Sequence, residues 1–507
     1  MSEARKLTRR DALVGAAAVA AATAVGSGRP SGAVAAPPAP PAGAWRHGGA
    51  LAQRGLDVAA TAGRNKEARF GLMFKRLDAF APPDDALVAL ARRMTDPGGP
   101  PAPGSDPLAD SGIPAGFTAL GQFIDHDMTF DQTPLTEQQV DPRGLTNFDS
   151  PLFDLGSVYG RGPQGSPELY DPRHPGQLLL ARPNGVDDLP RRPDGSPFVG
   201  DIRNDENVIL SQLHVAFIKV HNKLVDGGAR FADAQRLTRW HFQWIIVHDF
   251  LEHVVGEATV NRFLVTRNGR IQVRREHYKP ANPHRPMMPV EYAAAAYRFG
   301  HSMVRAAYRV NATTVAALFA NPPREDDLHG FRPLPAALAI DWAEFFAIDP
   351  DHTPRNHARR IDTRLSLPLH ELPPTVIPPD VQPLISDLAE RNLRRGKRVG
   401  LAAGQDVARA MGVAPLSNAE LGLTGPEWGG KAPLWFYILA EAELQEQGGR
   451  LGDVGGRIVA ETILGILDAD KGSYFHQRGW APTLPAAGDR FGIGDLLRFA
   501  GWRRLTT

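Results

Sequence analysis

The sequence predicts a mainly α-helical protein, most of which is a single large domain with long loops and little β structure. The first supporting observation is that apolar residues recur at helical spacing in residues 115–130, 206–226, 234–256, 290–309, 380–394, 403–411, 433–445 and 453–468. The second is that alternating strand patterns are scarce. The third is that two regions rich in proline, glycine and aspartate, 131–202 and 311–379, separate helices, and loops of that length are usually functional.

Length and composition restrict the class of protein. With 507 residues the chain exceeds a small binding module, although a large helical enzyme can pack this length around one core. The 57 basic and 56 acidic residues give a formal charge of +1, so no overall field attracts nucleic acid or an anionic membrane. Cysteine is absent, which removes disulfides, iron–sulfur clusters and thiolate metal sites. A bound metal would therefore take histidine or a weaker ligand.

The N-terminus resembles a signal for export. In residues 1–36, Lys6 and the pair Arg9-Arg10 precede an alanine-rich run, and small residues that suit a signal peptidase follow at Ala33-Val34-Ala35. The arginine pair resembles a twin-arginine signal, and the run is too short to cross a bilayer core of about 30 Å. We therefore expect a bacterial protein that is exported to the periplasm or secreted, without stable membrane insertion. Residues 37–50 would be a Pro-rich disordered leader, and residues 51–507 the mature domain.

A helix over residues 115–130 would place four polar side chains on two faces. Positions three and four apart share a helix face, so Gln122, Asp125 and His126 can line one cavity, whereas Asp127 is rotated away from it. Taken alone, a His–Asp pair on an amphipathic helix is more often a core or surface histidine. Blocks further along the chain decide between these interpretations.

Three later blocks supply the partners of this helix. They are Gly200-Asp201-Ile202-Arg203-Asn204-Asp205-Glu206, Tyr297-Arg298-Phe299-Gly300-His301 and Asn392-Leu393-Arg394-Arg395. In order, content and spacing the four blocks resemble the animal-type heme peroxidases, also called the peroxidase-cyclooxygenase superfamily, over residues 110–410 or so. The resemblance implies one large helical domain that binds heme b and acts on hydrogen peroxide and a small reducing substrate.

The resemblance assigns His126, Arg203 and Gln122 to catalysis. His126 matches the base that moves a proton from the inner to the outer peroxide oxygen, a contribution that is typically about two to four orders of magnitude in rate. Arg203 matches the catalytic arginine, because a guanidinium keeps its charge in a dry pocket while negative charge develops on the O–O bond. Gln122 matches a glutamine near the halide site, which favours halide oxidation without naming the ion.

Two carboxylates match the positions at which mammalian members attach heme covalently. Asp125 and Glu206 correspond to the residues that become ester-linked to heme methyl groups, and both are present. We therefore expect ester-linked heme b, formed by the enzyme's own turnover of peroxide. Asn207 stands where one subfamily has a methionine that forms a sulfonium link, so no sulfonium bond is expected.

His301 matches the protein ligand of the heme iron. It lies on a predicted apolar helix, residues 292–308, where Gly300 would let the backbone come close to the macrocycle. A metal-bound imidazole usually donates its other N–H to an acceptor, and Asn392 matches the family's asparagine in that role.

Two arginines match positions near the heme propionates. Arg298 lies one turn before His301, and Arg395 one turn after Asn392. The basic run 391–398 has two other interpretations, a nucleic-acid patch and a solvated basic face. The balanced net charge and the match at Asn392 favour the heme interpretation for Arg395.

The resemblance also implies a calcium site on the other face of the first helix. In the family the residue at the position of Asp127 joins a calcium loop, which residues 150–160 resemble, and calcium takes about six to eight oxygen ligands. Gly156 stands where the family often has a ligating serine, so weaker binding or a substituting water is expected. A capped turn without metal stays the alternative. The matching positions are Asp127, Ser150, Leu152, Asp154 and Gly156.

Together these assignments predict a peroxidase that reduces hydrogen peroxide and oxidises halide, thiocyanate or small organic donors. One alternative is a fatty-acid dioxygenase of the same superfamily, whose radical tyrosine lies three residues before the proximal histidine. Here that position is Arg298, and Tyr297 would be rotated by about 100° on a helix. Another alternative is a secreted heme-binding protein without turnover, against which the intact catalytic residues argue.

Further histidines lie on predicted helices. Their spacings of seven and five do not place pairs on one face, as metal ligands four apart would lie. We expect core or surface roles for His214, His221, His241, His248 and His253. The sequence leaves the oligomeric state open.

Overall fold

The computed structural model describes residues 70–95, 110–129, 151–283, 286–320, 322–373 and 385–503. By their contacts, residues 42–507 form one unit. Three predictions lie outside the described residues, namely the export signal at 1–36, the leader at 37–50 and the calcium ligand at Ser150.

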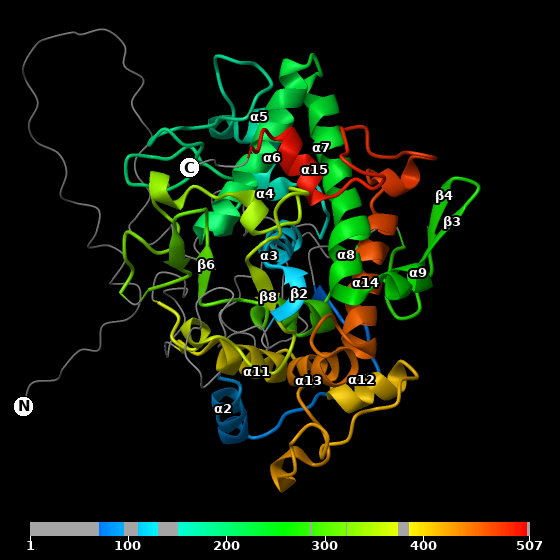
Figure 1. The fold of residues 1–507 in the computed structure, drawn as a ribbon. Helices are drawn as coiled ribbons and strands as arrows, with labels where there is room; N and C mark the ends of the chain where they lie inside the picture. The colour runs from blue at the N-terminus through cyan, green and yellow to red at the C-terminus, as the bar shows by residue number, and fades with distance from the viewer. Residues whose placement is uncertain are drawn as a thin grey trace, which may run out of the picture. The chain divides into compact units, whose positions relative to one another are not determined.

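Helices dominate the described residues, which confirms the predicted fold class (Figure 1). Near the centre of that view lies α3, with α7, α8 and α14 on one side of it and α11, α13 and α12 below. The longer helices are α2 (Asp84–Arg93), α3 (Gly116–Met128), α6 (Val208–Asp226), α7 (Phe231–Ile245), α11 (Leu388–Arg398), α13 (Leu434–Glu446) and α14 (Asp453–Ala469). The shorter ones are α4 (Gly156–Tyr159), α5 (Gly162–Gly165), α8 (Leu251–Val255), α9 (Glu257–Phe263), α10 (Val290–Ala294), α12 (Gly404–Ala410) and α15 (Ile493–Phe499).

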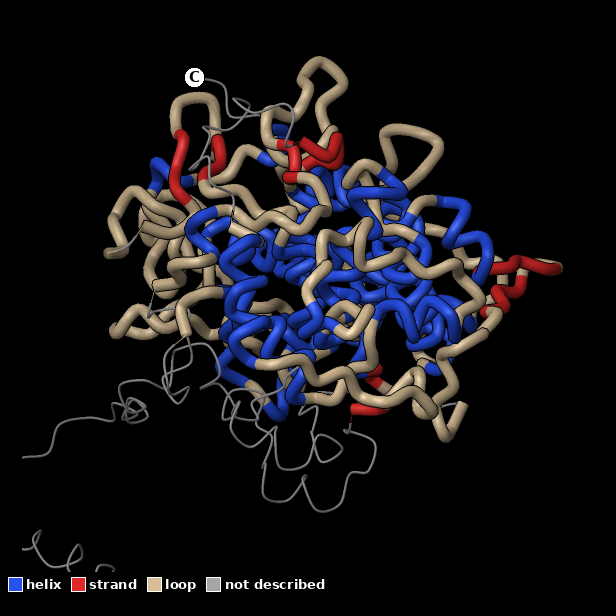
Figure 2. Tube along the Cα trace, turned by 90° about the horizontal axis from the view of Figure 1, so that it is seen from below, coloured by secondary structure: helices blue, strands red, loops and turns tan. Residues whose placement is uncertain are grey.

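Strands are short and pair only two at a time among the described residues. Figure 2 shows them at the edges of the helical body. One pair is parallel, β1 (Phe70–Gly71) with β5 (Met288–Pro289). The antiparallel pairs are β2 (Asp110–Pro114) with β8 (His357–Arg359), β3 (Leu264–Arg267) with β4 (Arg270–Val273), and β6 (Ala307–Arg309) with β7 (Val315–Ala317).

Buried polar groups fix where the core helices begin. The side chain of Asn207 caps α6 by accepting from the backbone N–H of Leu210 at 2.9 Å. The carboxylate of Glu441, on α13, accepts from the N–H groups of Val454 and Gly455 at 2.9 and 3.1 Å. An anion at a helix N-terminus is stabilised by the unpaired N–H groups there, so Glu441 ties the start of α14 to α13.

The helix predicted over 234–256 is present but contains a π-helical segment. Helix α7 continues through η6 (Ile246–Phe250), a π-helix, into α8, which ends at Gly256 with φ 81°. A π-segment inserts an extra residue into the helical ladder and rotates the side chains that follow. Segment η6 packs against α3, so this irregularity lies next to the helix that carries His126.

The single helix predicted over 290–309 is wrong. Helix α10 ends at Ala294, a tight 3₁₀ segment η7 (Ala296–His301) follows, and β6 begins at Ala307. The backbone leaves the helical conformation at Ala295 (φ −138°, ψ −73°). Nε of Arg298 donates at 3.0 Å to the carbonyl of Ala293, the acceptor that the N–H of Tyr297 would use in a continuing α-helix. His301 therefore ends a 3₁₀ segment instead of lying mid-helix.

The helix predicted over 380–394 is shifted along the chain. Helix α11 begins after Asp387, whose carboxylate accepts from the N–H of Glu390 at 3.0 Å as an N-cap, and it runs to Arg398. The shift keeps Asn392 and Arg395 within the same helix, as predicted.

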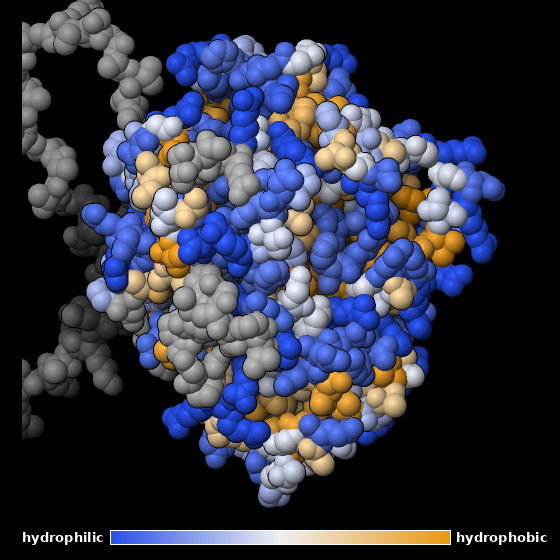
Figure 3. Space-filling model, viewed as in Figure 1, coloured by the Kyte–Doolittle hydropathy of each residue, from blue (hydrophilic) through white to orange (hydrophobic). Residues whose placement is uncertain are grey.

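The surface is mainly polar on the face drawn in Figure 3, where apolar residues are scattered among hydrophilic ones. Within the described ranges, no helix is both long enough and apolar enough to cross a membrane.

Candidate active site

Helix α3 presents its polar face toward η5 (Ile202–Asp205) and its apolar face toward the core. Phe123 stacks on Phe217 of α6 with ring centroids 4.9 Å apart, which fixes the rotation of the helix. His126 is consequently buried, with 4% of its surface exposed, and Gln122 and Asp125 are half-buried. The structure therefore brings these three predicted residues to the side of α3 that meets η5.

An asparagine that sequence reasoning missed fixes the imidazole of His126. Nδ1 of His126 lies 3.0 Å from Oδ1 of Asn204, and Nδ2 of Asn204 lies 3.1 Å from Nδ1 of His214. Since an amide oxygen only accepts and an amide nitrogen only donates, His126 carries its proton on Nδ1 and His214 accepts on its own Nδ1. This leaves Nε2 of His126 as the acceptor.

The two histidines bonded to Asn204, His126 and His214, are uncharged near neutral pH. Burial lowers the pKa of His126 below its ordinary value, and the charge of Arg203 lowers it further, against the raising effect of Glu206. Burial lowers the pKa of His214 to about 3. His214, expected to have a plain core role, is thus the second support of His126.

Arg203 is held rigidly at the end of α3. Its Nε and Nη2 bond the carboxylate of Asp201 at 3.1 and 2.7 Å, and Nη2 also donates to the carbonyls of His126, at 3.2 Å, and Thr129. Burial disfavours the charge, but Asp201 raises the pKa of Arg203 above its ordinary value. The guanidinium therefore remains a fixed positive group beside His126.

Glu206 and Gln122 meet across the gap between η5 and α3. Nε2 of Gln122 donates to Oε2 of Glu206 at 3.0 Å, and Nδ2 of Asn207 lies 3.5 Å from Oε1 of Gln122. Asp125 is electrostatically coupled to both His126 and Arg203. The predicted residues of α3 and of the block 200–206 thus lie together. Asp201, Asn204 and His214 bond to members of this group.

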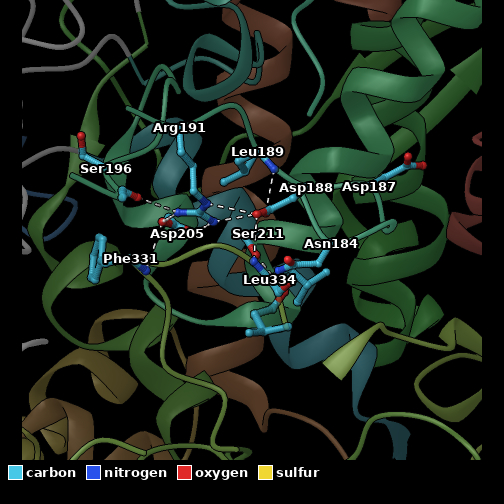
Figure 4. Close-up of polar contacts among 12 residues, drawn as sticks. Asn184, Asp187, Asp188, Leu189, Arg191, Ser196, Asp205, Ser211, Phe331 and Leu334 are labelled. Atoms are coloured by element: carbon cyan, nitrogen blue, oxygen red, sulfur yellow. Dashed lines mark hydrogen bonds and ion pairs between the residues drawn. The ribbon is translucent and has the colours of Figure 1, made fainter. Parts of the chain in front are cut away.

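A buried ion-pair cluster holds η5 in place through Asp205, the last residue of that segment (Figure 4). The guanidinium of Arg191 bonds Asp205 at 2.6 and 2.9 Å and Asp188 at 3.1 and 3.2 Å, and no more than 7% of each side chain is exposed. Asp205 and Asp188 also accept from the N–H groups of Phe331 and Leu334 at 3.1 and 2.9 Å. Because Asp205 lies between Arg203 and Glu206 in the chain, this cluster fixes the turn that carries both.

The candidate proximal side is built from η7 and α11. Nδ1 of His301 lies 2.7 Å from Nδ2 of Asn392, whose Oδ1 accepts from Nη1 of Arg298 at 2.6 Å. The indole of Trp435 lies edge-on to His301, with ring centroids 6.5 Å apart. Burial and the nearby Arg298 lower the pKa of His301 to about 3. The imidazole is thus neutral, the form that binds a metal.

One predicted contact is reversed in this arrangement. The sequence predicted that Asn392 accepts the Nδ1 proton of His301 through its amide oxygen. Instead Arg298, which can only donate, occupies that oxygen and turns the amide nitrogen toward His301. For the predicted hydrogen bond to form, the amide of Asn392 would have to rotate and Arg298 would have to bond another group.

The residues around His301 fit a flat, anionic group. A Cβ placed on Gly300 would meet no described atom within 4 Å, so the backbone there offers an open approach. Burial and the like charge of Arg395 lower the pKa of Arg391. Half-buried cations that repel one another are stabilised by an anion between them, and the carboxylates of heme are of that kind. The neutral imidazole of His301 and the open backbone at Gly300 are thus compatible with a heme, whose carboxylates would be counter-ions for arginines of α11.

The predicted calcium loop lies against the far face of α3. Oδ2 of Asp127 accepts from the N–H of Leu155 at 2.8 Å, and Oδ1 accepts from the N–H and hydroxyl of Ser157, each at 3.2 Å. Oδ1 of Asp154 accepts from the N–H of Gly156 at 3.0 Å. Among the described residues no three His, Asp or Glu side chains form a metal cluster. The loop is therefore held to Asp127 by hydrogen-bond donors in this structure.

Comparison with known proteins decides the family. The family model for animal haem peroxidases matches residues 113–420, which is more than half of the chain. This chain belongs to the animal haem peroxidase family. The match spans all four blocks of the candidate site, from Gln122 to Arg395, so the family identification and the geometry concern the same residues.

Relatives within the animal haem peroxidases are distant. Peroxidasin of Drosophila melanogaster is 23% identical over 412 residues, which cover 69% of this chain, and chorion peroxidase of Aedes aegypti is 27% identical over 177 residues, or 31% of it. The chain spans only 24% and 22% of the lengths of these two proteins.

Solved structures agree with the fold of the animal haem peroxidases. Peroxidase A from Dictyostelium discoideum superposes with a TM-score of 0.54 at 17% identity, covering 80% of this chain and 87% of that one. A fatty acid alpha-dioxygenase of Arabidopsis thaliana gives 0.53 at 16% identity, covering 80% of this chain and 72% of that one. At such identities the likeness concerns the fold alone.

Proposed function

We propose that this protein is a heme-dependent peroxidase that reduces hydrogen peroxide and oxidises a halide, thiocyanate or a small organic donor. The observation that carries the proposal is His126, a buried neutral imidazole whose Nδ1 bonds Asn204 and whose neighbour Arg203 is a fixed cation. Heme, when bound, supplies an iron that takes two oxidising equivalents from peroxide and passes them to the donor. Family membership supports the heme requirement.

His126 acts as the proton carrier. Nε2 accepts the proton of the peroxide oxygen nearer the iron and returns it to the departing oxygen, so that water leaves in place of hydroxide. The bond from Nδ1 to Asn204 keeps the proton off Nε2. Because burial lowers the pKa of His126, the acceptor form persists below the usual imidazole value of about 6.5.

Arg203 stabilises the charge that develops on the departing oxygen. Its guanidinium is held by Asp201 and by the carbonyls of α3, so it needs no reorganisation during the reaction. A preorganised donor of this kind typically contributes about 3–4 kcal/mol in a dry site. Gln122, whose Nε2 donates to Glu206, is the proposed contact for an anionic or polar donor once Glu206 is ester-linked to heme.

Asp125 and Glu206 are the proposed attachment points of heme through ester bonds, and His301 is the proposed iron ligand. Arg298 and Arg395 would hold the propionates. With Arg298 on a propionate, the amide oxygen of Asn392 becomes available to His301, which is the contact that a metal-bound imidazole prefers.

Two further parts of the proposal concern the whole protein. A calcium ion at Asp127, Ser150, Leu152, Asp154 and Gly156 would hold the far face of α3, with carbonyl oxygens completing the set. The N-terminal sequence supports a bacterial protein exported through a twin-arginine signal.

The dioxygenase alternative is disfavoured by the surroundings of Tyr297, four residues before His301 in the chain. The hydroxyl of Tyr297 donates to the backbone carbonyl of Gly121 at 3.2 Å, and a carbonyl cannot take the proton that a tyrosine loses on oxidation. Robust oxygen uptake with linoleate and no peroxide, abolished by Tyr297→Phe, would revive this alternative.

The optical spectrum of the purified protein tests the proposal. A Soret band that shifts when peroxide is added, and that resists acid-acetone extraction, would support an ester-linked heme peroxidase. Colourless protein from cells well supplied with heme would overturn the cofactor assignment. A heme protein that oxidises no donor faster than free heme and takes up no oxygen with linoleate would leave only the non-enzymatic alternative.

A further inference from the structure

Aromatic side chains from distant parts of the chain gather beside α7. Trp480 packs on Trp240, Trp244 and Tyr474, with ring centroids 5.4, 6.0 and 5.3 Å apart. The ring centroid of Trp244 in turn lies 5.6 Å from that of Tyr474 and 4.0 Å from that of His248. The cluster thus joins α7, the π-segment η6 and the short 3₁₀ segment η12 (Tyr474–His476).

A tyrosine and a histidine at the centre of this cluster form a hydrogen-bonded pair. The hydroxyl of Tyr474, which is fully buried, lies 3.1 Å from Nε2 of His248. Burial lowers the pKa of His248 to about 4, so the imidazole is neutral. In the tautomer with the proton on Nδ1, Nε2 accepts the hydroxyl proton of Tyr474. Proton transfer to such a base accompanies the oxidation of a phenol, because the neutral radical is far more stable than the charged one.

The pair lies on the segment that packs against the catalytic helix. His248 is in the middle of η6, and Phe250 ends that segment. The ring of Phe250 lies 3.1 Å from the position of a Cβ on Gly121, and its centroid lies 6.2 Å from that of Tyr297. Segment η6 therefore carries both His248, which lies in the cluster, and Phe250, which packs on the wall formed by α3 and η7.

The other end of the cluster reaches the surface. Trp240 and Trp480 are partly exposed, whereas Tyr474 has no exposed area. The guanidinium of Arg236 lies 5.4 Å above the ring of Trp240 and disfavours a positive charge there. Trp480 is accordingly the better contact for an electron donor.

We propose that Tyr474 and His248 form a one-electron relay through which electron-rich aromatic donors, in contact with Trp480, reduce oxidised heme without entering the heme pocket. The proposal rests on the proposed peroxidase function, which supplies the oxidant. Tyr474 gives one electron to peroxide-oxidised heme, and its hydroxyl proton moves to Nε2 of His248. A phenol at Trp480 then returns one electron, His248 returns the proton, and the phenol leaves as a phenoxyl radical after losing its own proton to water.

The chain contains a matched control for this relay. The hydroxyl of Tyr159 lies 3.0 Å from Nδ1 of His221, and both residues are fully buried. The described ring partners of this second pair include Phe231 but no tryptophan. Tyr159→Phe therefore removes the same chemical group from a pair without the surface connection. Tyr159 is not one of the proposed calcium ligands of the loop 150–160, and its hydroxyl bonds His221.

Two measurements on the holoprotein test the proposal. The first is kcat/KM for iodide and for a methoxyphenol carried on polyethylene glycol, which cannot enter a pocket. We expect Tyr474→Phe and Trp480→Phe to lower kcat/KM for the tethered phenol about tenfold or more and to leave iodide within about twofold, whereas Tyr159→Phe changes neither. The second is electron paramagnetic resonance after peroxide without donor, where a tyrosyl signal present in wild type should disappear in Tyr474→Phe and persist in Tyr159→Phe.

The outcomes separate this inference from the proposed function. An unchanged radical signal in Tyr474→Phe, or equal oxidation of the tethered phenol, overturns the relay while iodide oxidation by wild type still supports the peroxidase. If Tyr474→Phe lowers heme content, His248→Gln keeps the phenol and removes the base, and an unchanged radical yield in that variant also overturns the relay. Failure of wild type to oxidise either donor overturns both.

Discussion

Oδ1 of Asn204 lies 3.0 Å from Nδ1 of His126, and the same amide bonds His214 at 3.1 Å. The side-chain amide of Asn204 therefore bonds both histidines. As a result His126 carries its proton on Nδ1, whereas His214 carries its proton on Nε2. An amide can do this in only one orientation, because its oxygen accepts and its nitrogen donates. The position of the proton on His126, and with it the acceptor character of Nε2, thus depends on Asn204.

Asn204 provides the first prediction. Asn204→Leu removes the acceptor for Nδ1 of His126, so the rate of reaction with peroxide should fall about tenfold, equivalent to about 1.4 kcal/mol in the barrier. Asn204→Asp keeps an acceptor and adds negative charge, which should restore much of the rate. Stopped-flow mixing with peroxide measures both rates, and equal losses in the two variants would contradict a tautomer role.

The pH dependence of the same reaction should shift in a defined direction. Burial, assisted by Arg203, lowers the pKa of His126, so in wild type the rate should fall on the acid side only below the usual value of about 6.5. In Asn204→Asp the added charge favours imidazolium, so the acid limb should move to higher pH. A limb that stays in place would show that another group controls it.

Much of the candidate site follows from the sequence because it depends on local spacing. A helix places Gln122, Asp125 and His126 on one face whatever surrounds it, and α3 has the predicted extent to within two residues at either end. The block 200–206 likewise keeps Arg203 and Glu206 one turn apart. Periodicity and spacing are properties of the segment itself, and a sequence displays them.

The missed contacts depend on segments far apart in the chain. Asn204 gains its role from His126 and His214, and Asp205 gains its role from Arg191, fourteen positions away through a loop. At the break in the helix predicted over 290–309, the side chain of Arg298 bonds the carbonyl of Ala293 in place of a backbone N–H. In a sequence, a charged side chain one turn ahead indicates only weakly that it will bond a helix carbonyl, because tertiary contacts override helix propensity.

The Arg191 cluster provides the second prediction. Arg191→Met leaves Asp188 and Asp205 buried without their cation and should destabilise the fold by about 3–5 kcal/mol. It should also lower heme retention, because η5 carries Arg203 and Glu206. The control is Lys219→Met, which breaks the neighbouring, partly exposed pair with Asp187 and should cost about 0.2–1 kcal/mol.

The pH dependence of folding stability, compared between wild type and Asp205→Asn, also tests this cluster. Burial raises the pKa of Asp205 to about 6, even though Arg191 opposes the shift. A carboxyl whose pKa is raised on folding contributes stability below its unfolded value of about 3.9 and loses that contribution as pH rises through the folded pKa. Urea unfolding of Asp205→Asn should therefore lack a decrease in stability that wild type shows between about pH 4 and 6. Identical pH profiles would contradict the assignment.

Asn392 provides the third prediction. Asn392→Leu removes the group that can accept from His301, so heme affinity should fall about 10- to 100-fold, as it does when partners of metal ligands are lost. Arg394→Leu is the control on the same helix, because its partners are Asp84 and Glu390 and not the site. Titration of apoprotein with heme measures both affinities, and equal losses would point to α11 as a whole.

Calcium removal provides the fourth prediction. A chelator should loosen the far face of α3 and change the Soret band and the peroxide rate together, because Asp127 directly follows His126. Asp127→Asn should have the same effect without chelator. A chelator without effect on either quantity, combined with a strong effect of Asp127→Asn, would mean that the donors of Leu155 and Ser157 alone hold the loop.

The central claim is that His126 and His301 serve opposite faces of one bound heme, and peroxide mixing with their alanine variants tests it most directly. His126→Ala should keep the heme and its Soret band while the rate of reaction with peroxide falls by about two to four orders of magnitude. His301→Ala should lose heme or change its resting spectrum before any peroxide is added. The same defect in both variants would contradict the assignment of the two faces.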